Sequence, residues 1–135
     1  MRLVEQIVEI VPGQRACATR VTRLDDWYFA GHFPANPVVP AIALVELLAQ
    51  TGGLAIELPP NSVTKTLRLA SLNDFKFPSA AGPGVLLQAT AQVVGRLGRL
   101  VKIAGSVTAD GRLVATGTLM LAEVASPESA GRDRA

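Results

Sequence analysis

The residues best suited to chemistry are His32, the one histidine of the chain, and Glu46, the only charge in the apolar stretch from Pro40 to Gln50. Both side chains are poor choices for packing in such surroundings. Imidazole and carboxyl groups together can move protons at neutral pH. One group can remove a weakly acidic proton while the other protonates a departing hydroxyl group. The pair therefore indicates acid–base catalysis.

Two kinds of supporting group follow from a helix that begins at Pro40. The backbone N–H groups of Ala41 and Ile42, aided by the helix dipole, are candidates to bind a developing oxyanion. Proline has no N–H, so Ala41 is the first of these donors. Gln50 lies one turn beyond Glu46 on the same face and can orient its carboxyl group. A carboxyl group withdrawn from water by this apolar helix favours its protonated form, which suits Glu46 as an acid.

Each of these residues also has an interpretation without chemistry. His32 precedes several prolines and can simply cap a loop. Glu46 can be a buried carboxylate satisfied by backbone groups, although such burial is costly. Gln50 can satisfy a buried backbone group instead of orienting Glu46.

Composition excludes several classes of protein. The net charge of the 135 residues is only +2, and the aromatic residues are not interleaved with basic ones, which argues against nucleic-acid binding. Cys17 is alone, so no disulfide framework or zinc site is expected, and we interpret it as a small core residue. No stretch resembles a signal peptide or reaches the length of a membrane span. We expect a cytoplasmic protein without membrane insertion.

The elements that must position these residues are extended segments and one long helix. The helix runs from Pro40 to about Leu58, is apolar nearly all round, and is expected to be surrounded by protein. The loop before it, from Asp25 to Pro40, holds three prolines. The extended segments are Leu3–Val11, Gln14–Leu24, Thr66–Phe77, Leu86–Val94, Arg99–Thr108 and Leu113–Glu123. An antiparallel sheet wrapped around one central helix, an α+β fold, buries such a helix best. We predict one domain over residues 1–124 and a disordered tail over 125–135.

One motif resembles a known family. It combines Glu46 and Gln50 with the preceding run Gly31-His32-Phe33-Pro34-Ala35-Asn36-Pro37-Val38-Val39-Pro40. This pattern is similar to the signature of the 3-hydroxyacyl-acyl-carrier-protein dehydratases of the FabZ/FabA type, which have the hotdog fold. The segment Phe75-Lys76-Phe77-Pro78 and the loop at Pro83-Gly84 echo the family more weakly.

The resemblance implies dehydration of a 3-hydroxyacyl thioester to the trans-2-enoyl thioester, as in fatty-acid synthesis. His32 would be the base and Glu46 the acid or water-binding partner, supported by Gln50 and Phe33. The substrate would be carried by acyl carrier protein or by coenzyme A. No cofactor or metal is implied, because proton transfer between side chains suffices. In this family the His and Glu meet across a dimer interface, so a homo-oligomer built from dimers is expected. The spacing alone leaves a meeting within one chain equally open.

Some residues outside the motif allow more than one role. Arg96, Arg99 and Lys102 form a modest basic cluster that suits either an acidic carrier protein or plain solvent exposure. Tyr28 and Phe29 suit core packing better than an acyl tunnel.

Departures from the family pattern keep other functions open. The family usually has glycine at the positions of Ala41 and Ala35, and Val85 replaces its usual acidic residue, which favours a specialised lipid pathway over standard elongation. One alternative is a hotdog acyl-thioester hydrolase. Another is a non-catalytic acyl-binding subunit, which the methyl group of Ala41 keeps open because it narrows the approach to the helix.

Overall fold

The computed structural model describes residues 2–30, 36–56 and 65–125. These residues form six strands, one α-helix and one short 3-10 helix. The strands are β1 (Gln6–Val11), β2 (Arg15–Val21), β3 (Lys65–Lys76), β4 (Leu86–Leu97), β5 (Leu100–Ala109) and β6 (Arg112–Ala125). The helices are η1 (Trp27–Phe29) and α1 (Ala41–Ala55).

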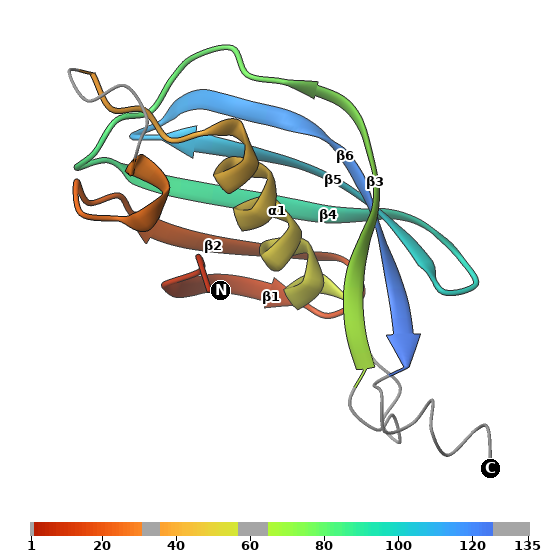
Figure 1. The fold of residues 1–135 in the computed structure, drawn as a ribbon. Coiled ribbons are helices and arrows are strands. Elements are labelled where there is room, and N and C mark those ends of the chain that lie inside the picture. Colours follow the sequence, from red (N-terminus) through yellow and green to blue (C-terminus); the bar gives the residue numbers. More distant parts are fainter. Residues whose placement is uncertain (1, 31–35, 57–64, 126–135) are drawn as a thin grey trace.

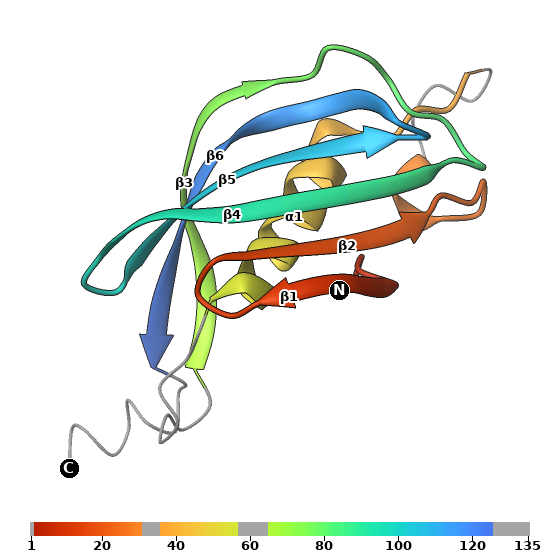
Figure 2. The ribbon, with the colours of Figure 1, turned by 180° about the vertical axis from the view of Figure 1, so that it is seen from behind.

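The strands build one curved, antiparallel sheet in the order β1-β2-β4-β5-β6-β3. α1 crosses the concave face of this sheet, and no other described element covers the opposite face (Figures 1 and 2). This arrangement is the hotdog fold, and it confirms the predicted α+β class with a sheet wrapped around one helix.

The core lies between α1 and the sheet. The helix buries mainly leucine and alanine side chains, among them Leu44, Leu47 and Leu48. The inward positions of β4 alternate as Leu87, Ala89 and Ala91, all of them buried. Because these alanines are short, the helix can lie close to the sheet without leaving voids.

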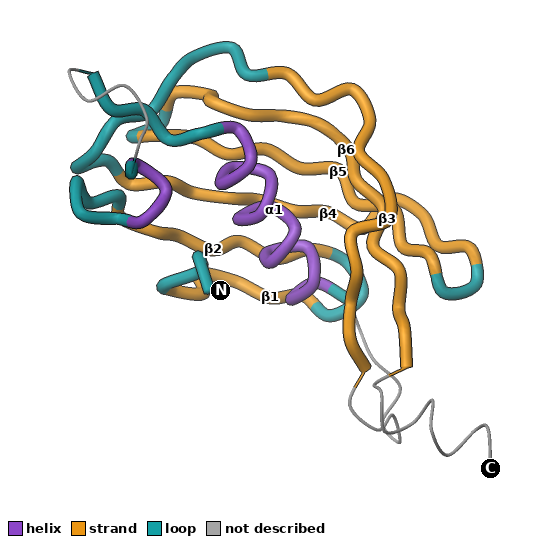
Figure 3. Tube along the Cα trace, in the orientation of Figure 1, coloured by secondary structure: helices purple, strands orange, loops and turns teal. Residues whose placement is uncertain are grey.

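The loop between β2 and α1 and the loop between β3 and β4 gather at one end of the sheet (Figure 3). Thr22 accepts a hydrogen bond from the Gly84 N–H and donates its own N–H to the Val85 carbonyl, which joins the loop after β2 to the loop before β4. Val39 donates its N–H to the carbonyl of Ala81 at 2.7 Å, just before α1 begins. These bonds fix the start of α1 against the neighbouring loop.

The element boundaries differ from the prediction mainly at the end of the helix. The six strands lie where the alternation and turn residues placed them. The helix, however, ends at Ala55, and Ile56 is already extended rather than helical. The Gly13 N–H binds the Ala55 carbonyl at 2.8 Å, so the β1–β2 turn supplies a partner to the end of the helix. The predicted tail beyond Ala125 lies outside the described residues.

The structure also bears on the expectations for Cys17, for the segment before α1 and for membrane-spanning helices. Cys17 is buried in β2, as expected of a small core residue. The segment predicted as a loop before α1 contains the 3-10 turn η1, in which Tyr28 and Phe29 are buried. In the part of the chain that the structure describes, α1 is too short to span a lipid bilayer, as is η1.

Candidate active site

The start of α1 has two backbone donors that no described residue engages. Pro40 caps the helix with an extended backbone, and its carbonyl accepts hydrogen bonds from the N–H groups of Ala43 and Leu44. The first N–H groups of a helix have no partner within it. Among the described residues, none accepts a hydrogen bond from the N–H of Ala41 or Ile42. Both N–H groups can therefore bind an anionic oxygen at this end of the helix.

Glu46 lies in the second turn of α1 and is exposed. The helix was expected to be surrounded by protein, and that expectation is wrong for the single chain. α1 turns one side outward, and Ile42, one turn before Glu46, is 66% exposed on it. Part of the apolar surface of the helix is thus not buried in the core of its own chain.

Gln50 holds the carboxyl group of Glu46 from one turn further along. Its side-chain Nε2 donates to Glu46 Oε1 at 3.1 Å. Its Oε1 accepts two backbone N–H groups, from Leu3 at 2.7 Å and from Val4 at 3.3 Å. Gln50 therefore does both things that the sequence left as alternatives, since it satisfies buried backbone groups and contacts Glu46.

An open cleft of about 550 Å³ lies beside this pair. Glu46 and Gln50 contribute its carboxyl and amide groups, and Arg2 contributes a cation. The rest of the lining is mainly aliphatic and comes from the N-terminal segment, α1, β3 and β6: Val4, Ala49, Gly53, Leu54, Leu67, Leu69 and Leu121. A cleft with an apolar wall and a few polar groups at one place suits an aliphatic chain with a reactive polar end.

Of the other residues of the predicted site, some lie outside the described residues and some lie away from Glu46. His32 and Phe33 lie outside the described residues. Arg96, Arg99 and Lys102 belong to the β4–β5 hairpin and its approach, at the opposite end of the sheet from the start of α1 (Figure 1). Within this cluster, Arg96 forms an ion pair with the buried carboxylate of Glu123.

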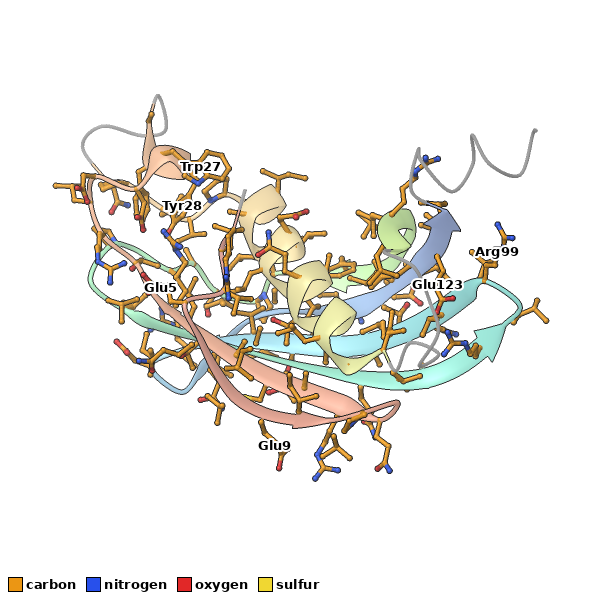
Figure 4. The ribbon with its side chains drawn as sticks, turned by 90° about the horizontal axis from the view of Figure 1, so that it is seen from below. Glu5, Glu9, Trp27, Tyr28, Arg99 and Glu123 are labelled. Atoms are coloured by element: carbon orange, nitrogen blue, oxygen red, sulfur yellow. The ribbon has the colours of Figure 1, made fainter. Side chains whose placement is uncertain are left out.

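A polar cluster that the sequence analysis missed lies on the other side of the N-terminal segment. Arg20 Nη2 contacts Asp26 Oδ1 at 2.9 Å, and the two side chains are only 12% and 10% exposed. The Tyr28 hydroxyl donates to Asp26 Oδ2 at 2.5 Å and accepts from Arg20 Nε at 3.3 Å. Figure 4 shows Tyr28 at one end of the molecule and the labelled Arg99 and Glu123 at the other. The sequence contained a sign of this cluster. Arg20 follows Ala16 and Ala18 at the inward positions of β2, where a charged side chain needs a partner.

The groups of this cluster shift one another's pKa. Burial, and then the hydrogen bond to Asp26, raise the pKa of Tyr28 to about 12. Burial works against ionisation of Asp26, but hydrogen bonds from Tyr28 and from the Arg23 N–H, together with the charge of Arg20, lower its pKa overall. Arg20 is likewise desolvated, yet its partners Tyr28 and Asp26 raise its pKa. At neutral pH the cluster is an ion pair bridged by a protonated tyrosine.

The curved sheet, the single helix on its concave face and the Glu46–Gln50 pair beside an apolar cleft define a hotdog-fold protein with a candidate acid–base site. The family model of the FabA-like domain matches residues 1–118. The chain therefore belongs to the FabA-like family.

Curated relatives cover almost the whole chain. A protein of Herpetosiphon aurantiacus is 37% identical over 122 residues, which are 90% of this chain and 86% of that protein. One of Thermomicrobium roseum is 35% identical over 133 residues, which are 98% of this chain and 88% of that protein. Both are named 3-hydroxyacyl-[acyl-carrier-protein] dehydratase FabZ.

Solved structures show the same fold at low sequence identity. The dehydratase heterocomplex ApeI:P of Xenorhabdus doucetiae superposes with a TM-score of 0.77 at 13% identity, covering 99% of this chain and 90% of that one. A hypothetical protein of Thermus thermophilus described as a thioesterase superfamily member gives a TM-score of 0.71 at 17% identity, covering 94% and 93%. The fold alone is thus shared by proteins with different named activities.

Proposed function

We propose that this protein is a 3-hydroxyacyl-[acyl-carrier-protein] dehydratase, which removes water from the thioester to give the trans-2-enoyl product. The observation that carries the proposal is the set of relatives of that name, 34–37% identical over most of the chain. Glu46 beside an aliphatic cleft supports it, because the reaction needs an acid next to a site for an acyl chain.

In the proposed reaction, His32 removes a proton from the carbon next to the thioester carbonyl. The N–H groups of Ala41 and Ile42 stabilise the negative charge that develops on the carbonyl oxygen. The bond between the third carbon and its hydroxyl group then breaks, and Glu46 supplies the proton with which the hydroxyl leaves as water. The electron pair of the broken C–H bond forms the new double bond. Proton transfer from His32 back to Glu46 restores the starting state, so the cycle consumes no cofactor.

The site is proposed to be completed by a second copy of the chain. β3 is the last strand of the sheet, so one of its edges is unpaired within the described residues. It is 12 residues long and exposes Leu69 and Leu72. A long edge strand with exposed apolar side chains is a template for pairing with another chain. The exposed Ile42 and the outward side of α1 are further apolar surface for a homodimer to cover.

The carrier is proposed to be acyl carrier protein, with coenzyme A as the alternative, and the compartment the cytoplasm. Arg99 and Lys102 are exposed on and beside the β4–β5 hairpin, whereas Arg96 is occupied by Glu123. Two exposed cations suit an acidic partner, and their attraction mainly speeds its association.

A carrier-linked assay tests the function directly. It follows conversion between 3-hydroxyacyl and trans-2-enoyl thioesters of several chain lengths, with free thiol measured in parallel. We expect turnover by the wild type and its loss in both His32→Ala and Glu46→Gln. Glu9→Gln is the control, because Glu9 is an exposed carboxylate of the edge strand β1, where it pairs with Arg15. Release of thiol without enoyl product would identify a thioesterase, and tight acyl-carrier binding without turnover would identify a binding subunit.

A further inference from the structure

We infer that Arg20 is a positioning residue for the Glu46 carboxyl group, acting through the peptide groups of Leu3 and the side-chain amide of Gln50. The inference rests on the proposed role of Glu46 as the acid. Its basis is an unbroken series of hydrogen bonds from the buried Arg20–Asp26–Tyr28 cluster to the edge of the cleft.

The first step of this series passes through Leu3. Arg20 Nη1 donates to the Leu3 carbonyl at 3.2 Å, and the Leu3 N–H donates to Gln50 Oε1 at 2.7 Å. The Leu3 side chain is 1% exposed and belongs to the core. Both polar groups of one backbone residue are thus occupied, one by the cluster and one by Gln50, while its side chain is held by packing.

The second step fixes which way the Gln50 amide faces. Because its oxygen accepts the N–H groups of Leu3 and Val4, its nitrogen must face Glu46. The nitrogen donates to Oε1 of Glu46, and in a protonated carboxyl group the carbonyl oxygen is a better acceptor for such a bond than the hydroxyl oxygen. The proton that Glu46 gives to the leaving hydroxyl is therefore assigned to Oε2. A rotated amide would present an oxygen to Glu46 and remove this distinction.

The third step concerns the contacts that hold the Arg20 side chain in place. Its guanidinium group contacts Asp26 and Tyr28 and lies over the Tyr28 ring, 5.6 Å from the ring centre. A nearly buried ion pair costs desolvation energy that an apolar pair of similar volume would avoid. In return it provides a donor of fixed position to the Leu3 carbonyl. A catalytic acid must be held in one orientation, and a donor of fixed position in the surrounding structure helps to hold it there.

A double-mutant cycle between Arg20 and Gln50 tests the inference. Arg20 binds the Leu3 carbonyl, whereas Gln50 binds the Leu3 N–H and Glu46, so independent roles of the two side chains would give effects that multiply in kcat. We expect Arg20→Met and Gln50→Ala each to lower kcat about tenfold with little change in KM, and the double variant to be no slower than the worse single one. Arg20→Lys should recover part of the loss. Arg15→Met is the matched control, since Arg15 lies on the same strand in an exposed pair with Glu9.

Nuclear magnetic resonance gives a second measurement that does not depend on turnover. We expect Arg20→Met to shift the side-chain NH₂ resonances of Gln50, and Arg15→Met to leave them in place. If Arg20→Met does not fold, Tyr28→Phe replaces it in both measurements, because only one hydroxyl group is lost. Multiplicative effects on kcat, or unshifted Gln50 resonances, would overturn the inference. Full activity of Glu46→Gln would instead overturn the proposed site, while the resonance shift would still decide whether the series exists.

Discussion

Gly105 of β5 lies directly beneath Leu48 of α1, and a methyl group on Gly105 would come within 2.5 Å of Leu48 Cδ1 and 2.8 Å of the Thr90 carbonyl oxygen. Leu48 is fully buried at the centre of the helix. The missing side chain at Gly105 therefore sets how closely α1 approaches the sheet. Because Glu46 belongs to the same helix, this contact also sets how far Glu46 stands from β3 and β6 across the cleft.

Replacing Gly105 by alanine is expected to destabilise the protein. The new methyl group must displace Leu48 and strain a β-strand carbonyl, and overpacking of this kind costs about 1 to 3 kcal/mol. Urea unfolding should show a lower midpoint with an unchanged slope. Gly95→Ala is the control, because its methyl group would meet only Lys102 Cβ at an ordinary 3.8 Å. Equal stability of the two variants would contradict the packing argument.

The strands could be predicted because their signals are local. Asp110 and Gly111 form the β5–β6 turn with positive φ angles of 48° and 84°, as an Asp-Gly pair in a hairpin predicts. The end of α1 could not be placed, because Ala55 meets the Gly13 N–H from a distant turn. A tertiary contact of this kind leaves no trace in helical periodicity.

The candidate site was predicted where it depends on helical spacing and missed where it depends on distant segments. The Glu46–Gln50 hydrogen bond follows from a separation of four residues in a helix. The hydrogen bonds from Leu3 and Val4 to Gln50 join the N-terminal segment to α1 across 47 and 46 residues of sequence. No local sequence pattern predicts such bonds. The exposure of Glu46 was also missed. The hydrophobicity of the helix indicates that its surface is buried, but it does not show whether its own chain or a second chain buries it.

Ala41→Gly is predicted to improve catalysis at a small cost in stability. The Ala41 side chain is exposed at the end of the helix, where the thioester must approach the N–H groups. Removing the methyl group keeps the donor and opens the approach, so kcat/KM should rise about threefold or more. Glycine at this position should lower stability by at most about 1 kcal/mol. Steady-state kinetics and thermal unfolding measure both effects, and unchanged or lower kcat/KM would show that the methyl group is no obstacle.

Tyr28→Phe is predicted to change how stability depends on alkaline pH. Tyr28 has a pKa of about 12 in the folded state, above its ordinary value of 10.0. Its contribution is therefore complete below pH 10, and it is lost as the pH rises through 12. At pH 8 the loss of the hydroxyl should cost about 1 to 2 kcal/mol. Denaturant unfolding of both proteins at pH 8 and pH 11.5 should show this difference shrinking, and a constant difference would contradict the raised pKa.

Charge reversal at the β4–β5 hairpin is predicted to weaken use of the carrier-bound substrate. In Arg99→Glu combined with Lys102→Glu, KM for acyl carrier protein should rise about fivefold or more at low salt and less at high salt. KM for a short pantetheine thioester, which lacks the acidic protein, should not change. Arg15→Glu is the control, since it alters the charge of an exposed ion pair between β1 and β2, outside the β4–β5 hairpin. A similar rise for both substrates would mean that the hairpin does not bind the carrier.

Two inactive variants are predicted to restore activity to each other if the site is shared between chains. His32→Ala lacks the base and Glu46→Gln lacks the acid. When they are denatured together in equal amounts and refolded, half of the dimers contain one chain of each kind. Each mixed dimer then has one complete site and one site lacking both groups, so activity should return to about a quarter of the wild-type value. Each variant refolded alone is the control. Absence of activity in the mixture, with dimers confirmed by sedimentation, would place His32 and Glu46 of the same chain in one site.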